Sequence, residues 1–107
     1  MDSERRYGER KALKTYAIVT QKGSTSTEIE TIDISIGGLC LRSHQQLIVG
    51  QSYSIAFEVQ LNGNPRRIST TAEIAYSILT GDFYKTGLRF LDMDSATLNI
   101  LEEFLGS

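Results

Sequence analysis

The sequence predicts an all-β domain with one short terminal helix, and three observations support that fold class. Residues 53–62 and 68–78 alternate apolar and polar side chains with a period of two, as strands do when one face packs on a core. Glycine-containing turns separate these segments from other β-branched segments. Residues 97–105 change to a helical spacing of apolar side chains. We therefore expect a six-stranded antiparallel β-barrel plus a C-terminal α-helix, because closure removes exposed strand edges.

The first two strands are expected on either side of a glycine turn. Thr, Tyr, Ile and Val side chains over residues 11–21 favour the first strand, and Lys22-Gly23-Ser24 favours the turn. The second strand is expected over residues 27–34, where the alternation slips between Ile29 and Ile32. A slip of this kind indicates a β-bulge, a feature that is common near functional sites.

The next three strands are more regular. Gly37-Gly38 ends the second strand, residues 39–43 form the third, and residues 44–50 connect it to two long strands. Asn62-Gly63-Asn64 joins the long strands as a hairpin, since Asn-Gly favours a primed turn. The side chains expected to share the core-facing parity are Tyr53, Ile55, Phe57, Val59 and Leu61, then Ile68, Thr70, Ala72, Ile74, Tyr76 and Ile78.

The C-terminal part completes the barrel and adds the helix. Gly81-Asp82 marks a second hairpin, and residues 84–91 form the sixth strand. Asp94 is expected to be the N-cap of the helix. The helical spacing is defined by Thr97, Leu98, Ile100, Leu101, Phe104 and Leu105.

Composition limits the class of protein. A chain of 107 residues with 40% hydrophobic content is enough for one domain with a modest core. A net charge of -2 argues against a general nucleic-acid binder, which has a basic footprint. Five of the 11 basic residues nevertheless lie between Arg5 and Lys14. We expect residues 1–10 to be a flexible arginine-bearing arm suited to a small anionic ligand, followed by the barrel and helix over residues 11–107.

Cysteine and histidine are too few for a metal centre. Cys40 is the only cysteine, so the chain forms no intramolecular disulfide and a reducing compartment is expected. His44 is the only histidine, and a passive thiol is favoured over a Cys40–His44 catalytic pair. No segment approaches the ~18 apolar residues of a membrane span, and no signal peptide follows Met1. We expect a cytoplasmic protein that is not an enzyme and does not insert into membranes.

Two short motifs supply the groups needed to hold a guanine and a phosphate together. They are Arg5-Arg6-Tyr7-Gly8-Glu9-Arg10 and Asp33-Ile34-Ser35-Ile36-Gly37-Gly38. Arginine forks match the O6/N7 edge of guanine and phosphate oxygens, and their planes stack on bases. A carboxylate accepts from the N1 and N2 donors of guanine, and a hydroxyl or a glycine-freed amide serves either group. Standing alone, the second motif is more typical of a capped turn.

Strand parity predicts where these groups lie. Asp33 and Ser35 share parity and are expected to stand together on the barrel exterior. The opposite, core-facing parity belongs to Ile32, Ile34 and Ile36. Gly37-Gly38 lets the backbone turn and lets a ligand approach without a Cβ in the way. Arg42 faces outward, where it either reaches the same ligand or is an ordinary solvated arginine.

The two motifs resemble the signature of the PilZ domain, a bacterial receptor for cyclic di-GMP, which reads Arg-x-x-x-Arg followed by Asp/Asn-x-Ser-x-x-Gly. Arg6 and Arg10 fill the first pattern, and Asp33, Ser35 and Gly38 fill the second. Residues 87–91, Gly-Leu-Arg-Phe-Leu, are similar to the Gly-x-x-Phe strand that closes the barrel of this family. The resemblance therefore covers the chain from residue 4 onward.

The resemblance implies a role for each motif residue. Arg6 and Arg10 contact the phosphates and guanines of cyclic di-GMP, while Asp33 and Ser35 contact guanine edges. An extra arginine before the first pattern, here Arg5, is associated with two intercalated ligand molecules per chain. Binding would order the arm, because two phosphates cancel the repulsion among its arginines. One departure is the Gly8-Glu9 pair, where a negative charge beside the phosphates is expected to weaken affinity.

The leading hypothesis is a stand-alone cyclic di-GMP receptor that signals through a separate, unidentified effector protein, with no other cofactor. Three alternatives remain open. The first is a nucleotide-independent interaction adaptor of the same fold. The second is an oligonucleotide-binding barrel, disfavoured by the low net basicity. The third, enzymatic activity, lacks a nucleophile–base pair.

Overall fold

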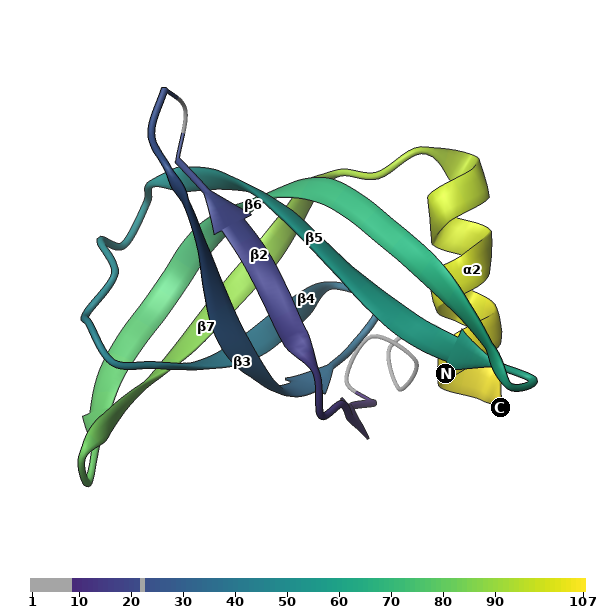
Figure 1. Ribbon diagram of the computed structural model, residues 1–107, viewed down its shortest axis with the longest axis horizontal. Coiled ribbons are helices and arrows are strands. Elements are labelled where there is room, and N and C mark those ends of the chain that lie inside the picture. Colours follow the sequence, from purple (N-terminus) through teal and green to yellow (C-terminus); the bar gives the residue numbers. More distant parts are fainter. Residues whose placement is uncertain (1–8, 22) are drawn as a thin grey trace.

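The computed structural model describes residues 9–21 and 23–107, and its strands close into a barrel (Figure 1). The described elements are β1 (Lys11–Ala12), β2 (Tyr16–Thr20), β3 (Ser26–Ile34), β4 (Gly38–Ser43), β5 (Ser52–Leu61), β6 (Asn64–Thr80), β7 (Phe83–Asp92) and α2 (Ser95–Gly106). The ring runs β3-β2-β5-β6-β7-β4, and antiparallel pairing of β4 with β3 closes it. This confirms the predicted six-stranded antiparallel barrel with a C-terminal helix.

The first predicted strand is divided in two. Residues 13–15 separate β1 from β2 but still bond to β3, with the Leu13 amide donating to the Ile32 carbonyl at 3.0 Å and the Thr31 amide donating to the Thr15 carbonyl at 2.9 Å. The buried Thr31 also bonds this segment through its side chain. Its Oγ1 donates to the Leu13 carbonyl at 2.6 Å and accepts from the Thr15 amide at 3.0 Å. The prediction of one continuous strand over 11–21 is therefore wrong, because the regular pairing is interrupted where the Thr15 amide bonds to a side-chain hydroxyl in place of a backbone carbonyl.

The predicted irregularity in the second strand is present. The register of β3 against β4 shifts between Thr31 and Asp33, which leaves Ile32 as the extra residue of a bulge. Ile34 is fully buried and Ile36 packs against the core, as expected. Ile32 is only half-buried and lies outside the core cluster, so its predicted core-facing position is wrong. The bulge changes the parity in this part of β3.

The two long strands differ in how well their alternation predicts burial. In β5 all five predicted core residues are buried. In β6 the alternation holds through Ile74, and then a register shift between Ile74 and Tyr76 reverses it. Ser77 becomes buried, whereas Tyr76 and Ile78 face outward. Their predicted core-facing positions are therefore wrong.

The β5–β6 hairpin has the predicted primed turn. Asn62 and Gly63 both have positive φ, 52° and 80°, which a type I′ turn requires. Leu61 pairs with Asn64 directly across it. The turn thus fixes the register of β5 against β6.

Helix α2 covers one end of the barrel, against β5 and β6 (Figure 1). Leu101 and Phe104 are its buried residues. The predicted cap is confirmed, because the Asp94 carboxylate accepts from the Thr97 amide at 2.7 Å. In the described part of the chain, no helix has the length and apolar character needed to span a bilayer.

At the opposite end, buried hydroxyls join three strands. Thr86 Oγ1 lies 3.0 Å from Ser43 Oγ and 2.9 Å from Ser77 Oγ. Ser77 Oγ also accepts from the Leu47 amide at 3.1 Å, which holds the 44–50 connection against β6. Each of these buried polar groups is satisfied, so the network adds order without a desolvation penalty.

The Asp94 cap predicts a pH-dependent contribution to stability. The hydrogen bonds from Thr97 lower the pKa of the Asp94 carboxyl below its ordinary value. The stabilisation is therefore fully present at neutral pH and is lost as pH falls through that lowered pKa. We expect Asp94→Ala to lower the melting temperature at pH 7, with a smaller difference at pH 3. Asp94→Asn, a neutral cap, is the matched control, and a pH-independent difference for Asp94→Ala would contradict the prediction.

Candidate ligand-binding site

The two motifs meet at the end of β3. Arg10 Nε donates to Asp33 Oδ1 at 2.7 Å, and Arg10 Nη1 donates to Ser35 Oγ at 3.2 Å. The side chains of Arg10 and Asp33 are 42% and 26% exposed, so the cluster is open to a ligand. Arg10 lies 23 residues before Asp33 and 25 before Ser35, and the fold brings the three side chains into contact.

Strand pairing brings them together. β1 pairs with β3 so that Ala12 lies opposite Asp33, which brings Arg10 to the last residues of β3. The next four residues form a tight turn, in which the Ser35 amide donates to the Gly38 carbonyl at 2.9 Å. Ser35 Oγ also accepts from the Gly37 amide at 3.3 Å. The capped-turn interpretation is therefore correct for Ser35, which still contacts Arg10.

Ser35 differs from its predicted exposure. It lies on the same side as Asp33, since both contact Arg10, yet its relative exposure is only 3%. The turn bends the backbone after Ile34 and draws the hydroxyl inward. Its oxygen faces Arg10, but the residue is not freely exposed on the barrel exterior as the sequence indicated.

Gly38 is required by backbone packing. A Cβ at this position would overlap the carbonyl oxygen of Leu88 on β7. Gly37 has open space around the same position. The second glycine of the motif therefore lets β4 approach β7 closely, and the first has no such restriction.

Beside the cluster, a row of four paired residues crosses the outer face of the sheet. Across β3, β4, β7 and β6, the paired residues are Asp33, Cys40, Gly87 and Tyr76. The Tyr76 ring lies directly over Gly87, where a Cβ would overlap it, and its hydroxyl is 3.9 Å from Cys40 Sγ. Burial raises the pKa of the Cys40 thiol, which agrees with a passive thiol. Tyr76, 37% exposed, thus extends an aromatic surface toward Asp33.

The sequence analysis missed Tyr76 and Gly87, which lie on the outer face beside the candidate site. The alternation of β6 assigned Tyr76 to the core, because a bulge cannot be located from apolar periodicity alone. One signal was present: a glycine inside a strand is often covered by an aromatic residue on the neighbouring strand. Gly87, in the middle of β7, is such a glycine, and Tyr76 is its partner.

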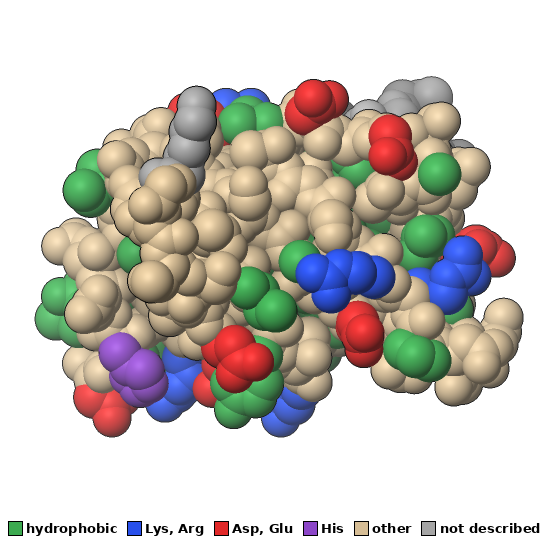
Figure 2. Space-filling view, turned by 45° about the horizontal axis from the view of Figure 1, so that its top comes forward, with side chains coloured by type: hydrophobic (Ala, Val, Ile, Leu, Met, Phe, Trp, Pro, Cys, Tyr) green, Lys and Arg blue, Asp and Glu red, His purple; other side chains and the backbone are tan. Residues whose placement is uncertain are grey.

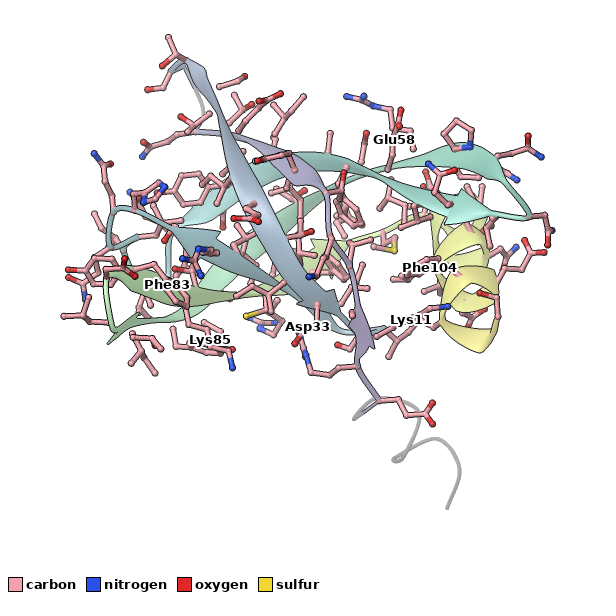
Figure 3. The ribbon with its side chains drawn as sticks, turned by 60° about the horizontal axis from the view of Figure 1, so that its bottom comes forward. Lys11, Asp33, Glu58, Phe83, Lys85 and Phe104 are labelled. Carbon is pink, nitrogen blue, oxygen red and sulfur yellow. The ribbon has the colours of Figure 1, made fainter. Side chains whose placement is uncertain are left out.

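Arg42 lies on the same outer face but is held by other groups. Its Nε is 3.8 Å from Glu30 Oε1, and its guanidinium carbon lies 4.0 Å from the centre of the Phe83 ring. Its neighbour across β7 is Lys85, and Figure 3 shows Phe83, Lys85 and Asp33 along one face of the barrel. The structure does not bring Arg42 into contact with the Arg10 cluster. Arg5 and Arg6 lie outside the described residues, as does most of the predicted arm.

Charges around this face are partly balanced. Arg10 pairs with Asp33, Arg42 with Glu30, and Arg89 with Glu73 at the far edge of the row. Lys85 also lies on this face, and among the described residues it forms no ion pair. Within the described ranges, no group of three or more His, Cys, Asp or Glu side chains could hold a metal ion. The arrangement can bind an anion and accept hydrogen bonds from a base.

Two hollows flank this face. One, of about 640 Å³, lies at the end opposite α2 between the β2–β3 hairpin and the β4–β5 connection, and Arg42 reaches its wall. His44 also lines this hollow, and in Figure 2 acidic and basic side chains gather around the histidine, which is drawn in purple. The other, of about 540 Å³, lies between Arg10, Lys11 and the end of α2. Because Asp33 and Ser35 line neither hollow, the candidate site is an open face with Arg10 at its border.

These features define a small closed β-barrel whose outer face presents an arginine–carboxylate–hydroxyl cluster beside a tight glycine turn. The sequence model of the PilZ domain matches residues 4–107, and the chain therefore belongs to the PilZ domain family. PilZ domains generally bind cyclic di-GMP and act on effector proteins as binding domains. No curated protein sequence matches the chain.

Solved structures share the fold at low sequence identity. The Bacillus subtilis inhibitor of motility MotI/DgrA superposes with a TM-score of 0.81 at 14% identity, over 90% of this chain and 47% of that one. The PilZ domain of CeSA from a cellulose-synthesizing bacterium gives 0.59 at 16% identity, over 92% and 95%. A tetrameric PilZ protein of Xanthomonas campestris gives 0.57 at 21% identity, over 79% and 47%. The chain thus spans about half the length of the first and last of these proteins.

The two glycines of the turn give a matched test of the packing argument. We expect Gly38→Ala to destabilise the fold by roughly 1–3 kcal/mol, the usual cost of overpacking, because the Leu88 carbonyl belongs to the backbone and cannot rotate away. Gly37→Ala should have little effect. Urea unfolding of both variants measures the difference, and equal stabilities would show that β4 and β7 separate easily at this point.

Proposed function

We propose that this protein is a cyclic di-GMP receptor whose ligand lies on the outer face of β3, β4, β7 and β6. The observation that supports it is the convergence of Arg10, Asp33 and Ser35 from two separate motifs. Arginine forks bind phosphate and guanine, and an adjacent carboxylate accepts from the donors of guanine. Membership of the PilZ family agrees with this ligand.

In this proposal Asp33 already has the geometry of a base acceptor. Its Oδ1 is held by Arg10, and the hydrogen bonds of the described residues leave its other oxygen available. Guanine N1 and N2 donors would then meet a carboxylate whose direction is fixed. Arg5 and Arg6 would come onto the same face beside Arg10, so that ligand binding orders the arm. Gly38 serves by letting β4 lie close to the Leu88 carbonyl, which holds the turn against β7.

The neighbouring side chains suit a ligand that has both bases and phosphates. The Tyr76 ring offers a stacking surface, since base–aromatic stacking contributes ~1–3 kcal/mol per base. Lys85 offers a cation to a phosphate. Arg42 would join by leaving Glu30, to which it is weakly held at 3.8 Å. Such a broad face suits two intercalated cyclic di-GMP molecules better than one compact nucleotide.

We also propose that the receptor acts through a protein partner. Four large apolar side chains are between 57% and 64% exposed at the end away from α2, namely Ile48, Val49, Ile78 and Leu79. Hydrogen bonds from Gln46 and Leu47 to Ser77 hold the two segments together. Exposed apolar side chains gathered in this way mark interaction surfaces. The same patch favours a second candidate function, an interaction adaptor that works without the nucleotide.

Substitution of the motif arginines tests whether they bind the ligand. We expect Arg10→Ala, and likewise Arg6→Ala, to lower cyclic di-GMP affinity at least tenfold in titration calorimetry. Charge-assisted hydrogen bonds contribute ~1.5–3 kcal/mol each, and ~1.4 kcal/mol is tenfold. Arg66→Ala, an exposed arginine on β6, is the matched control. Affinities that match the control would reject the arginine assignment.

Asp33→Ala separates a ligand contact from a capped turn. Loss of affinity with an unchanged melting temperature supports a direct contact with guanine. A lowered melting temperature with unchanged affinity would mean that Asp33 only supports the turn. The adaptor alternative is favoured if the unmodified protein shows no heat with cyclic di-GMP.

The stoichiometry prediction tests Arg5. We expect about two cyclic di-GMP molecules per chain, the ratio that the resemblance associates with the extra arginine. Arg5→Leu should move the ratio toward one while Arg6, Arg10 and Asp33 keep residual binding. Calorimetry gives the ratio directly. A ratio of one in the unmodified protein would reject the argument from Arg5 and leave the receptor proposal in place.

A further inference from the structure

Lys11, the residue next to Arg10, is directed to the opposite side of β1. Its Nζ donates to the Phe104 carbonyl at 2.9 Å, to the Ser107 main-chain oxygen at 3.1 Å and to Ser107 Oγ at 2.9 Å. The same ammonium lies 4.4 Å from the centre of the Phe104 ring. Figure 3 shows Lys11 and Phe104 side by side at α2. One lysine therefore uses all three of its donors on the end of the helix.

The helix end is capped by Ser107, whose amide and hydroxyl donate to the Phe104 carbonyl at 3.3 Å and 2.8 Å, and Lys11 adds a cation at the same carbonyl. The last carbonyls of a helix lack intrahelical partners and carry the negative end of its dipole. Helix α2 has no basic residue in its last turn. Lys11 supplies the missing positive charge from another element, and Phe104 anchors its stem by a cation–π contact in a half-buried setting. The interaction is thus stronger than that of a solvated surface lysine.

β1 links this contact to the candidate site. Only two residues long, it pairs Lys11 with Ile34 and Ala12 with Asp33. Arg10, one residue earlier, is bound to Asp33 and Ser35. The same short segment is therefore tied at one end to the ligand motif and at the other to the end of α2, more than 90 residues away in sequence.

We propose that Lys11 is a positioning residue that couples the nucleotide site to the last turn of α2. It holds β1 so that Arg10 is presented to the ligand, without touching the ligand itself. Coupling between two sites is reciprocal, so a ligand that fixes Arg10 must also fix the contacts of Lys11 at the helix end. This inference rests on the proposed function, since it gives the receptor a route from its ligand to the C-terminal helix.

The ligand arm of the test uses cyclic di-GMP itself. We expect Lys11→Met to weaken its affinity about fivefold or more, as coupling between sites typically does. Saturating cyclic di-GMP should slow amide exchange at residues 104–107 in the unmodified protein. That protection should be absent in Lys11→Met at saturation and restored in Lys11→Arg. Lys14→Met, an exposed lysine of the same segment, is the matched control and should behave like the unmodified protein.

A second measurement needs no ligand. Arg10→Ala removes the side-chain contacts that hold the start of β1 to the end of β3 and leaves the strand pairing in place. It should therefore speed amide exchange at residues 104–107 in the free protein, whereas Arg66→Ala should not. Unchanged exchange there in Arg10→Ala would overturn the coupling even if cyclic di-GMP binds normally. Unchanged or faster exchange on adding ligand would overturn it as well. If cyclic di-GMP failed to bind the unmodified protein, the proposed function would be overturned. The amide exchange of Arg10→Ala without ligand would still test the link between Arg10 and the end of α2.

Discussion

The structure depends on how β3 is shared among its neighbours. Its first half pairs with β2, and its second half pairs with both β1 and β4. The bulge at Ile32 lies where these pairings change, and it lets one strand serve three partners. Closure of the barrel and delivery of Arg10 to Asp33 follow from this one junction. The candidate site lies where the barrel closes, because Asp33 and Ile34 pair with β4, which closes the barrel, and also with β1, which carries Arg10 to Asp33.

The residues of the Asp33–Gly38 motif hold the turn and form the candidate site with the same atoms. Ser35 Oγ accepts from the Gly37 amide inside the turn and also from Arg10. Gly38 lets β4 approach the Leu88 carbonyl, which keeps the turn close to β7. A ligand that engages these groups therefore acts on the barrel's seam and not on a pendant loop. Relatives that keep the fold at 14–21% identity show how little of the remaining sequence the barrel requires.

The family motifs and most elements could be read from the chain because they depend on local rules. Asn62-Gly63 requires positive φ and gave the hairpin, and Asp94 gave the helix cap. The regular alternation of β5 predicted its buried face correctly. The resemblance assigns Arg10 and Asp33 to one ligand, and the structure adds a direct contact between the two side chains.

The sequence by itself determined the strand count of the barrel, its turns, the helix and the identity of the motif residues, because each depends on periodicity or on a residue's own backbone preference. Only the tertiary structure decided which face Tyr76 occupies, that Ser35 is buried, and that Arg42 is held by Glu30 and Phe83. It also decided that Lys11 contacts α2. The reason is physical: a bulge reverses parity without changing the pattern of residue types, and contacts across about 90 residues depend on strand register, which no local pattern encodes.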